Sequence, residues 1–193
     1  MRRIAVYCGS SPGANASYAE GARLLGREMA ARQIGLVFGG GRVGLMGVIA
    51  DAVLGAGGEV IGVIPAALEE KELAHRGCTE LHVVSTMHER KSLMADFAKG
   101  FIALPGGFGT MDEIFEMLTW GQLGYHTRPC GFLNISGFYD PLFAFLEHCV
   151  DERFVTRVHR EMIIAESDAG ALLDQMLAFE APDQTKWLDR FDL

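Results

Sequence analysis

The sequence predicts a doubly wound α/β fold, in which a parallel sheet lies between two layers of helices (α/β/α). Three observations support this prediction. Short apolar runs alternate along the chain with stretches that have the period of a helix. The runs are largely apolar, as expected for parallel strands covered on both faces. Two glycine-rich loops each follow such a run and precede a helical stretch. This arrangement is typical of Rossmann-like folds.

The individual elements follow from the same pattern. The expected strands are residues 4–8, 35–38, 59–64, 80–84, 101–104, 130–133 and 162–165. The expected helices are residues 16–32, 45–54, 86–97, 112–123, 141–150 and 169–179. No linker, low-complexity tract or internal repeat interrupts the alternation. We therefore expect one domain over residues 1–193, with a tail at 181–193 that packs Trp187 and Phe191 against the rest.

Length and charge restrict the possible partners. A chain of 193 residues suits one domain that buries a core without metal or disulfide staples. Its net charge of −8 disfavours nucleic acid and anionic membrane surfaces as partners. An anionic ligand must then be held locally, by backbone amides and a few cations. The four cysteines form no C-x-x-C pair, and neither a signal segment nor a membrane-spanning run is present. A cytoplasmic location is expected.

The loop PGGFGT at residues 105–110 is the strongest candidate for a ligand site. It lies between an expected strand and an expected helix. Its three glycines let the backbone approach a ligand closely, and the start of the helix presents free amides and positive potential. Thr110 adds a hydroxyl group. A phosphate is the natural ligand, although the loop lacks the Lys-Ser/Thr ending of an ATP-binding Walker motif.

Glu113 has two interpretations. The spacing Thr110-x-x-Glu113 fits a capping box, in which both side chains bind free amides at a helix start. Amides used in this way are less available to a phosphate. If the loop holds a phosphate instead, Glu113 is better placed to face the attached sugar.

Two further groups of residues are ambiguous. Arg90 and Lys91 lie near the start of an expected helix, where cations oppose the helix dipole unless an anion is nearby. The alternative interpretation is that both side chains lie on a solvated face of the helix. The loop GGGRVG at residues 39–44 contains G-x-G-x-x-G, the pattern of a dinucleotide-binding loop. However, it follows the second strand and not the first. The nearest acid downstream, Glu59, starts the next strand, whereas an acid that binds ribose should lie at the end of a strand. These features count against NAD, and both a tight turn and an anion-binding surface remain open for this loop.

Taken together, these motifs resemble the Lonely Guy family of cytokinin-activating phosphoribohydrolases, long mislabelled as lysine decarboxylases. The run PGGFGTMDE at 105–113 resembles the family signature PGGxGTxxE, and MHERK at 87–91 resembles a second element. The runs GGGRVGLMG at 39–47 and CGSS at 8–11 are similar to two more, in the same order. The resemblance extends from residue 4 to about residue 177.

The resemblance implies a homodimer that cleaves the N-glycosidic bond of AMP or an N6-substituted AMP, with no cofactor. The products are a free base and ribose 5-phosphate. The resemblance places the catalytic pair on Arg90 and Glu113. It also implies substrate contacts at Ser10, Gly40, Gly41, Glu72, Lys91, Gly107, Phe108, Gly109, Thr110 and Thr119. Many members carry Tyr at Phe38 and Phe108, and plant members often carry Ser at Arg42, so these positions bear on base or sugar preference.

Three other functions are compatible with parts of the sequence. A non-catalytic carrier of a nucleotide or of molybdenum cofactor has the same kind of fold, but a phosphate carrier gains little from an acid such as Glu113 beside an anion. A pyridoxal-dependent decarboxylase needs a Schiff-base lysine in a pocket, and of the four lysines only Lys91 lies near the expected site. The six histidines show no metal-ligand spacing, so no metal is expected.

The expected helix at 112–123 bears on the oligomeric state. Its apolar residues cover more than one face. Such a helix is either buried deep in the core or packed against a partner. Both possibilities remain open from the sequence.

Overall fold

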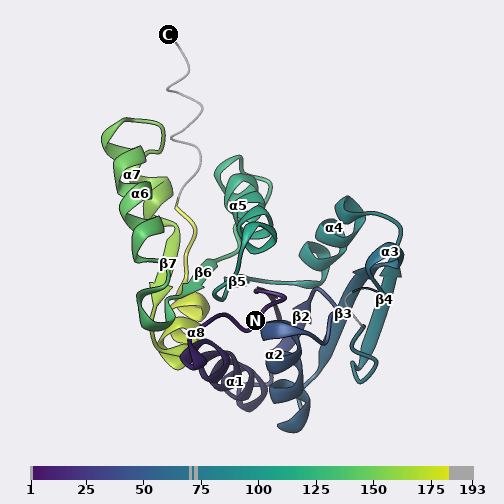
Figure 1. Ribbon diagram of the computed structural model, residues 1–193. Coiled ribbons are helices and arrows are strands. Elements are labelled where there is room, and N and C mark those ends of the chain that lie inside the picture. The colour runs from purple at the N-terminus through teal and green to yellow at the C-terminus, as the bar shows by residue number, and fades with distance from the viewer. Residues whose placement is uncertain (1, 70, 72–73, 183–193) are drawn as a thin grey trace.

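A parallel sheet runs through the part of the chain that the structure, a computed structural model, describes: residues 2–69, 71 and 74–182. Within these residues, seven strands lie in the order β4-β3-β2-β1-β5-β6-β7, and every neighbouring pair is parallel (Figure 1). The strands are β1 (Arg3–Tyr7), β2 (Gly35–Phe38), β3 (Val60–Pro65), β4 (Glu80–Val84), β5 (Phe101–Ala103), β6 (Cys130–Leu133) and β7 (Ile163–Glu166). The doubly wound α/β prediction is confirmed.

The helices connect successive strands. They are α1 (Ala16–Ala31), α2 (Gly44–Gly55), α3 (Ala66–Glu69), α4 (Met87–Phe97), α5 (Phe108–Gln122), the 3₁₀ helix η1 (Ile135–Gly137), α6 (Asp140–Asp151), α7 (Arg157–Glu161) and α8 (Ala169–Ala178). The chain begins at the centre of the sheet with β1, moves outward to β4, and then returns to place β5 on the other side of β1. This reversal of direction makes the carboxyl ends of β1 and β5 the switch point of the fold, where ligands bind in proteins of this kind.

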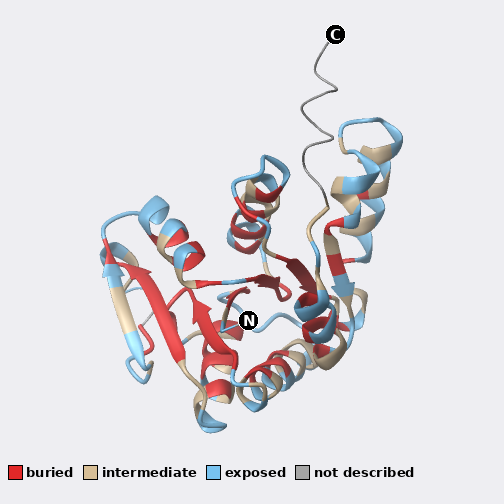
Figure 2. Cartoon of the chain, turned by 180° about the vertical axis from the view of Figure 1, so that it is seen from behind, coloured by how far each residue is buried: buried red, intermediate tan, exposed pale blue. Residues whose placement is uncertain are grey.

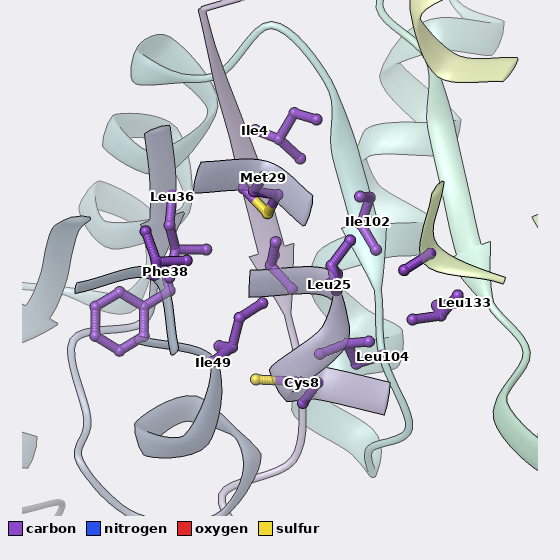
Figure 3. Packing of buried hydrophobic residues seen from close by; sticks show 14 of the residues in the cluster. Ile4, Cys8, Leu25, Met29, Leu36, Phe38, Ile49, Ile102, Leu104 and Leu133 are labelled. Atoms are coloured by element: carbon purple, nitrogen blue, oxygen red, sulfur yellow. The ribbon is translucent and has the colours of Figure 1, made fainter. Parts of the chain in front are cut away.

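Two hydrophobic layers cover the two faces of the sheet. On one face, Ile4 and Val6 of β1 pack with the buried sides of α1, α2 and α8. Figure 3 shows Leu25 and Met29 of α1 against this strand. On the other face, Tyr7 packs with α4 and α5. The central strands are accordingly buried on both sides (Figure 2), as their apolar composition predicts.

Most predicted boundaries agree with the structure. The strands predicted at 35–38, 80–84 and 130–133 have the observed bounds of β2, β4 and β6. The largest error is the start of α5, which begins at Phe108 and not at residue 112. The short helices α3, η1 and α7 were not predicted, because segments of three to five residues are too short to display a helical period.

Some expectations fall on residues that the structure does not describe. Glu72 is one of them, and so are Trp187 and Phe191 of the tail. Among the described residues, no helix is long and apolar enough to cross a membrane.

Candidate active site

A cavity of about 200 Å³ lies at the switch point, beside the carboxyl ends of β1 and β5. It is lined by Val6, Tyr7, Cys8, Gly9, Ser10, Gly39, Met46, Arg90, Gly107, Phe108, Gly109, Thr110 and Glu113. The cavity therefore brings together both predicted catalytic residues and five of the predicted substrate contacts, namely Ser10, Gly107, Phe108, Gly109 and Thr110.

The first turn of α5 forms one wall of the cavity. Its N-cap is Gly107, which has no side chain to bind the free amides. A helix leaves its first four N–H groups without intrahelical partners, and here they belong to residues 107–110, all of which line the cavity. The positive end of the helix dipole adds to their attraction for an anion. The backbone of this wall therefore offers the donors and the positive potential that attract an anion.

The capping-box interpretation of Glu113 is wrong. A capping residue must precede the helix with extended backbone, whereas Thr110 lies inside α5 and is buried. A variant of the capping box does occur in α4, in which the glutamate binds the amide of the residue before the N-cap. Thr86 is its extended N-cap, its hydroxyl accepts from the amide of Glu89, and the Glu89 carboxylate accepts from the amide of Ser85. The same spacing signal was present there in the sequence.

The glycines of the loop have two different roles. A Cβ on Gly106 would lie 2.1 Å from Oγ1 of Thr110 and 2.9 Å from the amide nitrogen of Gly9, so this position has no room for a side chain. A Cβ on Gly107 or Gly109 would meet no atom within 4 Å. Gly106 therefore permits close packing of the loop, whereas Gly107 and Gly109 leave space open for a ligand.

Hydrogen bonds hold the loop against the sheet. The Gly9 amide donates to the Pro105 carbonyl at 3.1 Å, and the Leu104 amide donates to the Tyr7 carbonyl at 2.9 Å. The buried hydroxyl of Tyr139 donates to the Leu104 carbonyl at 2.5 Å. These contacts fix the strand end from which this wall of the cavity projects.

Arg90 is 6% exposed, and the protein's own groups surround its guanidinium. Its Nε donates to the carbonyl of Val63 at 3.1 Å, and its Nη2 donates to the carbonyl of Gly39 at 2.9 Å. Its Nη1 lies 3.8 Å from Oε1 of Glu113, which is 8% exposed. The anion that explains this cation at a helix start is therefore a carboxylate of the protein.

Lys91 faces a different direction. Its Nζ lies 3.0 Å from a carboxylate oxygen of Asp112 and 3.2 Å from one of Glu116, so it links α4 to α5. Burial alone would lower the pKa of Lys91, but its hydrogen bonds to these two acids outweigh burial and raise it. Lys91 does not line the cavity, and its predicted contact with a substrate stays a prediction.

Three other predicted contacts also lie outside the cavity lining. Gly40 and Gly41 are buried in the loop after β2, and Gly40 has a φ of +77°. The positive φ favours the tight-turn interpretation of that loop. Of residues 39–44, Gly39 alone is among the described residues that line the cavity. Thr119 is exposed, and its hydroxyl donates to the Phe115 carbonyl one turn earlier in α5. Glu59 pairs with Arg3 at 2.7 Å and is not among the described residues that line the cavity.

Sequence reasoning missed several lining residues, among them Tyr7, Cys8 and Met46. Burial, followed by the charge of Glu113, raises the pKa of both the Tyr7 hydroxyl and the Cys8 thiol. Both groups are therefore neutral at physiological pH, and Cys8 is a poor nucleophile because the thiolate is the reactive form. Their position directly at the end of the first strand was the signal that could have identified them.

The fold and the cavity together define a class: a doubly wound α/β protein in which a helix N-terminus and a buried carboxylate farther along the same helix line one cavity. Among the described residues, His, Cys, Asp and Glu form no cluster of three or more that could hold a metal ion.

Comparisons with known proteins narrow this class. A family model described as possible lysine decarboxylase matches residues 46–176. The chain is 49% identical, over 173 residues, to the cytokinin riboside 5′-monophosphate phosphoribohydrolase LOG of Oryza sativa subsp. japonica, a match that covers 90% of this chain and 72% of that protein. It is 48% identical, over 168 residues, to a cytokinin riboside 5′-monophosphate phosphoribohydrolase of Rhodococcoides fascians, covering 86% of this chain and 85% of that one.

A solved structure extends the likeness of fold. The molybdenum cofactor binding protein from Rippkaea orientalis has a TM-score of 0.68 and 20% identity, with coverage of 91% of this chain and 95% of that one. At this identity the likeness concerns the fold alone. The two sequence relatives and the family model carry the assignment: this chain belongs to the Lonely Guy family of cytokinin riboside 5′-monophosphate phosphoribohydrolases.

Proposed function

We propose that this protein hydrolyses the N-glycosidic bond of adenosine 5′-monophosphates, with or without an N6 substituent, to a free base and ribose 5-phosphate. One observation carries the proposal. The free amides at the start of α5 and the carboxylate of Glu113 line the same cavity. Gly109 and Glu113 are four residues apart, which is about 6 Å along a helix axis. A ribose spans a comparable distance between its 5′-phosphate and its C1′ atom.

In this proposal the anion site at residues 107–110 binds the 5′-phosphate, and Ser10 and Thr110 contribute hydroxyl groups. The remote phosphate then fixes the sugar relative to Glu113, which lowers the entropic part of the barrier. The protein's net charge of −8 makes such a local site necessary for binding an anionic substrate.

Glu113 stabilises the transition state. When the C1′–N bond breaks, its electron pair goes to the base and positive charge develops on the sugar. An ionised carboxylate near C1′ stabilises this charge and orients the water whose oxygen forms the new bond to C1′. The water loses a proton, and the base gains one. Nη1 of Arg90, 3.8 Å from Oε1 of Glu113, places a positive charge beside this carboxylate.

The base extends beyond the cavity. A volume of about 200 Å³ is below the roughly 300–1,000 Å³ of most ligand pockets, so it suits the sugar phosphate and not a whole nucleotide. Preference between adenine and an N6-substituted adenine is then decided by surfaces outside this cavity.

The direct test is to incubate the protein with AMP and with N6-isopentenyl-AMP and to measure the products. We expect free base and ribose 5-phosphate in equal amounts. Nucleotide that is bound but recovered intact would support a non-catalytic carrier instead. A lysine decarboxylase activity is disfavoured, because no lysine is among the described residues that line the cavity.

The protein is also proposed to be a homodimer that pairs through α5 and its flanking residues. Phe108 is 97% exposed, and Leu123 and Tyr125 beyond the other end of the helix are 63% and 76% exposed. Pairing along α5 would bury these side chains and place the exposed Thr119 near the partner. Sedimentation velocity should give about twice the mass of 21.0 kDa; a monomer at micromolar concentration would contradict this arrangement.

A further inference from the structure

Gly39 is the first of three successive glycines after β2, and its backbone has no unusual conformation. Its φ is not among the positive values that occur at Gly40 and Gly44. Any residue is therefore compatible with the local backbone at this position. The reason for a glycine must be steric.

Arg90 supplies the steric reason. A Cβ on Gly39 would lie 1.9 Å from Nη2 of Arg90 and 3.0 Å from its Cζ, while the next neighbour, Sδ of Met46, would be 3.3 Å away, slightly closer than an ordinary van der Waals contact. The same Nη2 donates to the Gly39 carbonyl at 2.9 Å. The guanidinium thus occupies the space that a side chain on Gly39 would need.

A methyl group at this position would displace mainly the Arg90 guanidinium, while Sδ of Met46 would have to give by only a few tenths of an ångström. The clashing atom is at the end of a long side chain, whereas the two carbonyls that it faces belong to backbone: Val63 lies in β3, and Gly39 directly follows β2. Displacement would break the bond from Nη2 to Gly39 and strain the bond from Nε to Val63. It would also change the 3.8 Å separation between Nη1 and Glu113.

We propose that Gly39 is a positioning residue that sets the place of the Arg90 guanidinium and, through it, of the Glu113 carboxylate. The proposal explains why the loop at 39–44 begins with glycine, although Gly39 is its single described residue in the cavity lining. The expected effect on turnover rests on the proposed function. The contact between Gly39 and Arg90, and its loss in a variant, do not depend on that function.

The first measurement is kinetic and uses Gly39→Ala. We expect kcat for AMP hydrolysis to fall about 100-fold, the effect of misplacing a catalytic group by about 1 Å, with little change in KM because the anion site at 107–110 is untouched. The matched control is Gly55→Ala, where a Cβ meets no atom within 4 Å. Unchanged kcat in Gly39→Ala would overturn the proposal.

A double mutant separates positioning from general damage. Lysine at position 90 has no Nη2, so Gly39→Ala should cost little further activity in an Arg90→Lys background. If the glycine substitution lowers kcat by the same factor in both backgrounds, Gly39 does not act through Arg90 and the proposal is wrong.

A spectroscopic measurement needs no turnover. In protein labelled with ¹⁵N at the arginine Nε, the Arg90 signal, assigned by its loss in Arg90→Lys, should be protected from solvent exchange by its bond to Val63. We expect this signal to shift and lose protection in Gly39→Ala and to stay in place in Gly55→Ala. An unchanged signal would overturn the positioning role. Absence of hydrolysis by the unmodified protein would instead reject the proposed function alone.

Discussion

Glu113→Gln should lower kcat for AMP hydrolysis by about 10³-fold, with nucleotide affinity nearly unchanged. Glutamine keeps the shape of the side chain but cannot carry the negative charge that is proposed to stabilise the cationic sugar. Losing one preorganised electrostatic group at an active site typically costs about 10² to 10³ in kcat. Because the phosphate binds at residues 107–110, AMP should still bind, as calorimetry would show.

The control for this substitution lies on the same helix. Glu116 pairs with Lys91 at 3.2 Å and does not line the cavity. Glu116→Gln therefore makes the same chemical change outside the cavity. Because Glu116 does not line the cavity, we expect kcat to stay within about threefold of the unmodified value. Equal losses in the two variants, or full activity in Glu113→Gln, would show that the Glu113 charge has no special part in the reaction.

Gly109→Ala should have opposite effects on stability and on substrate binding. Gly109 is exposed and lies in the first turn of α5. Alanine is favoured over glycine within helices by about 0.5–1 kcal/mol, so the free energy of unfolding should rise. The added methyl group would also enter the space that the phosphate is proposed to occupy. A clash of this kind costs about 1–3 kcal/mol, which corresponds to a rise in Kd for AMP of roughly 5- to 150-fold.

The comparison with Gly55→Ala makes this prediction specific. Gly55 is the last residue of α2, and a Cβ there also meets no atom within 4 Å. Thermal unfolding and calorimetric titration with AMP should show a gain in stability for both variants and a loss of affinity for Gly109→Ala alone. Normal affinity in Gly109→Ala would place the phosphate away from the start of α5.

The two interpretations of Glu113 illustrate how far local sequence patterns can lead. Thr110-x-x-Glu113 and Thr86-x-x-Glu89 both match a capping box, but only the second forms one. The difference is the residue at which each helix begins. That residue depends on how the chain at 104–107 is held in place. Gly9 donates to the Pro105 carbonyl, and Tyr139 donates to the Leu104 carbonyl. Both contacts join segments that are distant in the sequence.

Arg90 and Lys91 illustrate the same point for charge. The sequence shows two adjacent cations near a helix start and indicates that an anion should be close. It does not show that successive helical residues point in directions about 100° apart, one toward Glu113 and the other toward Asp112 and Glu116. The distinction between a cavity residue and a link between helices appears only when α4 and α5 pack together.

The sequence by itself determined the order of strands and helices, the parallel sheet and the glycine loop at the start of α5, because apolar periodicity and glycine placement act over a few neighbouring residues. It also contained the motifs by which the family resemblance could be stated. The tertiary structure decided which residues share the cavity, where α5 begins, and why Gly39 must be a glycine. These features depend on contacts between segments far apart in the sequence, such as that between Arg90 and Gly39, which are 51 residues apart. A local pattern carries no information about such contacts.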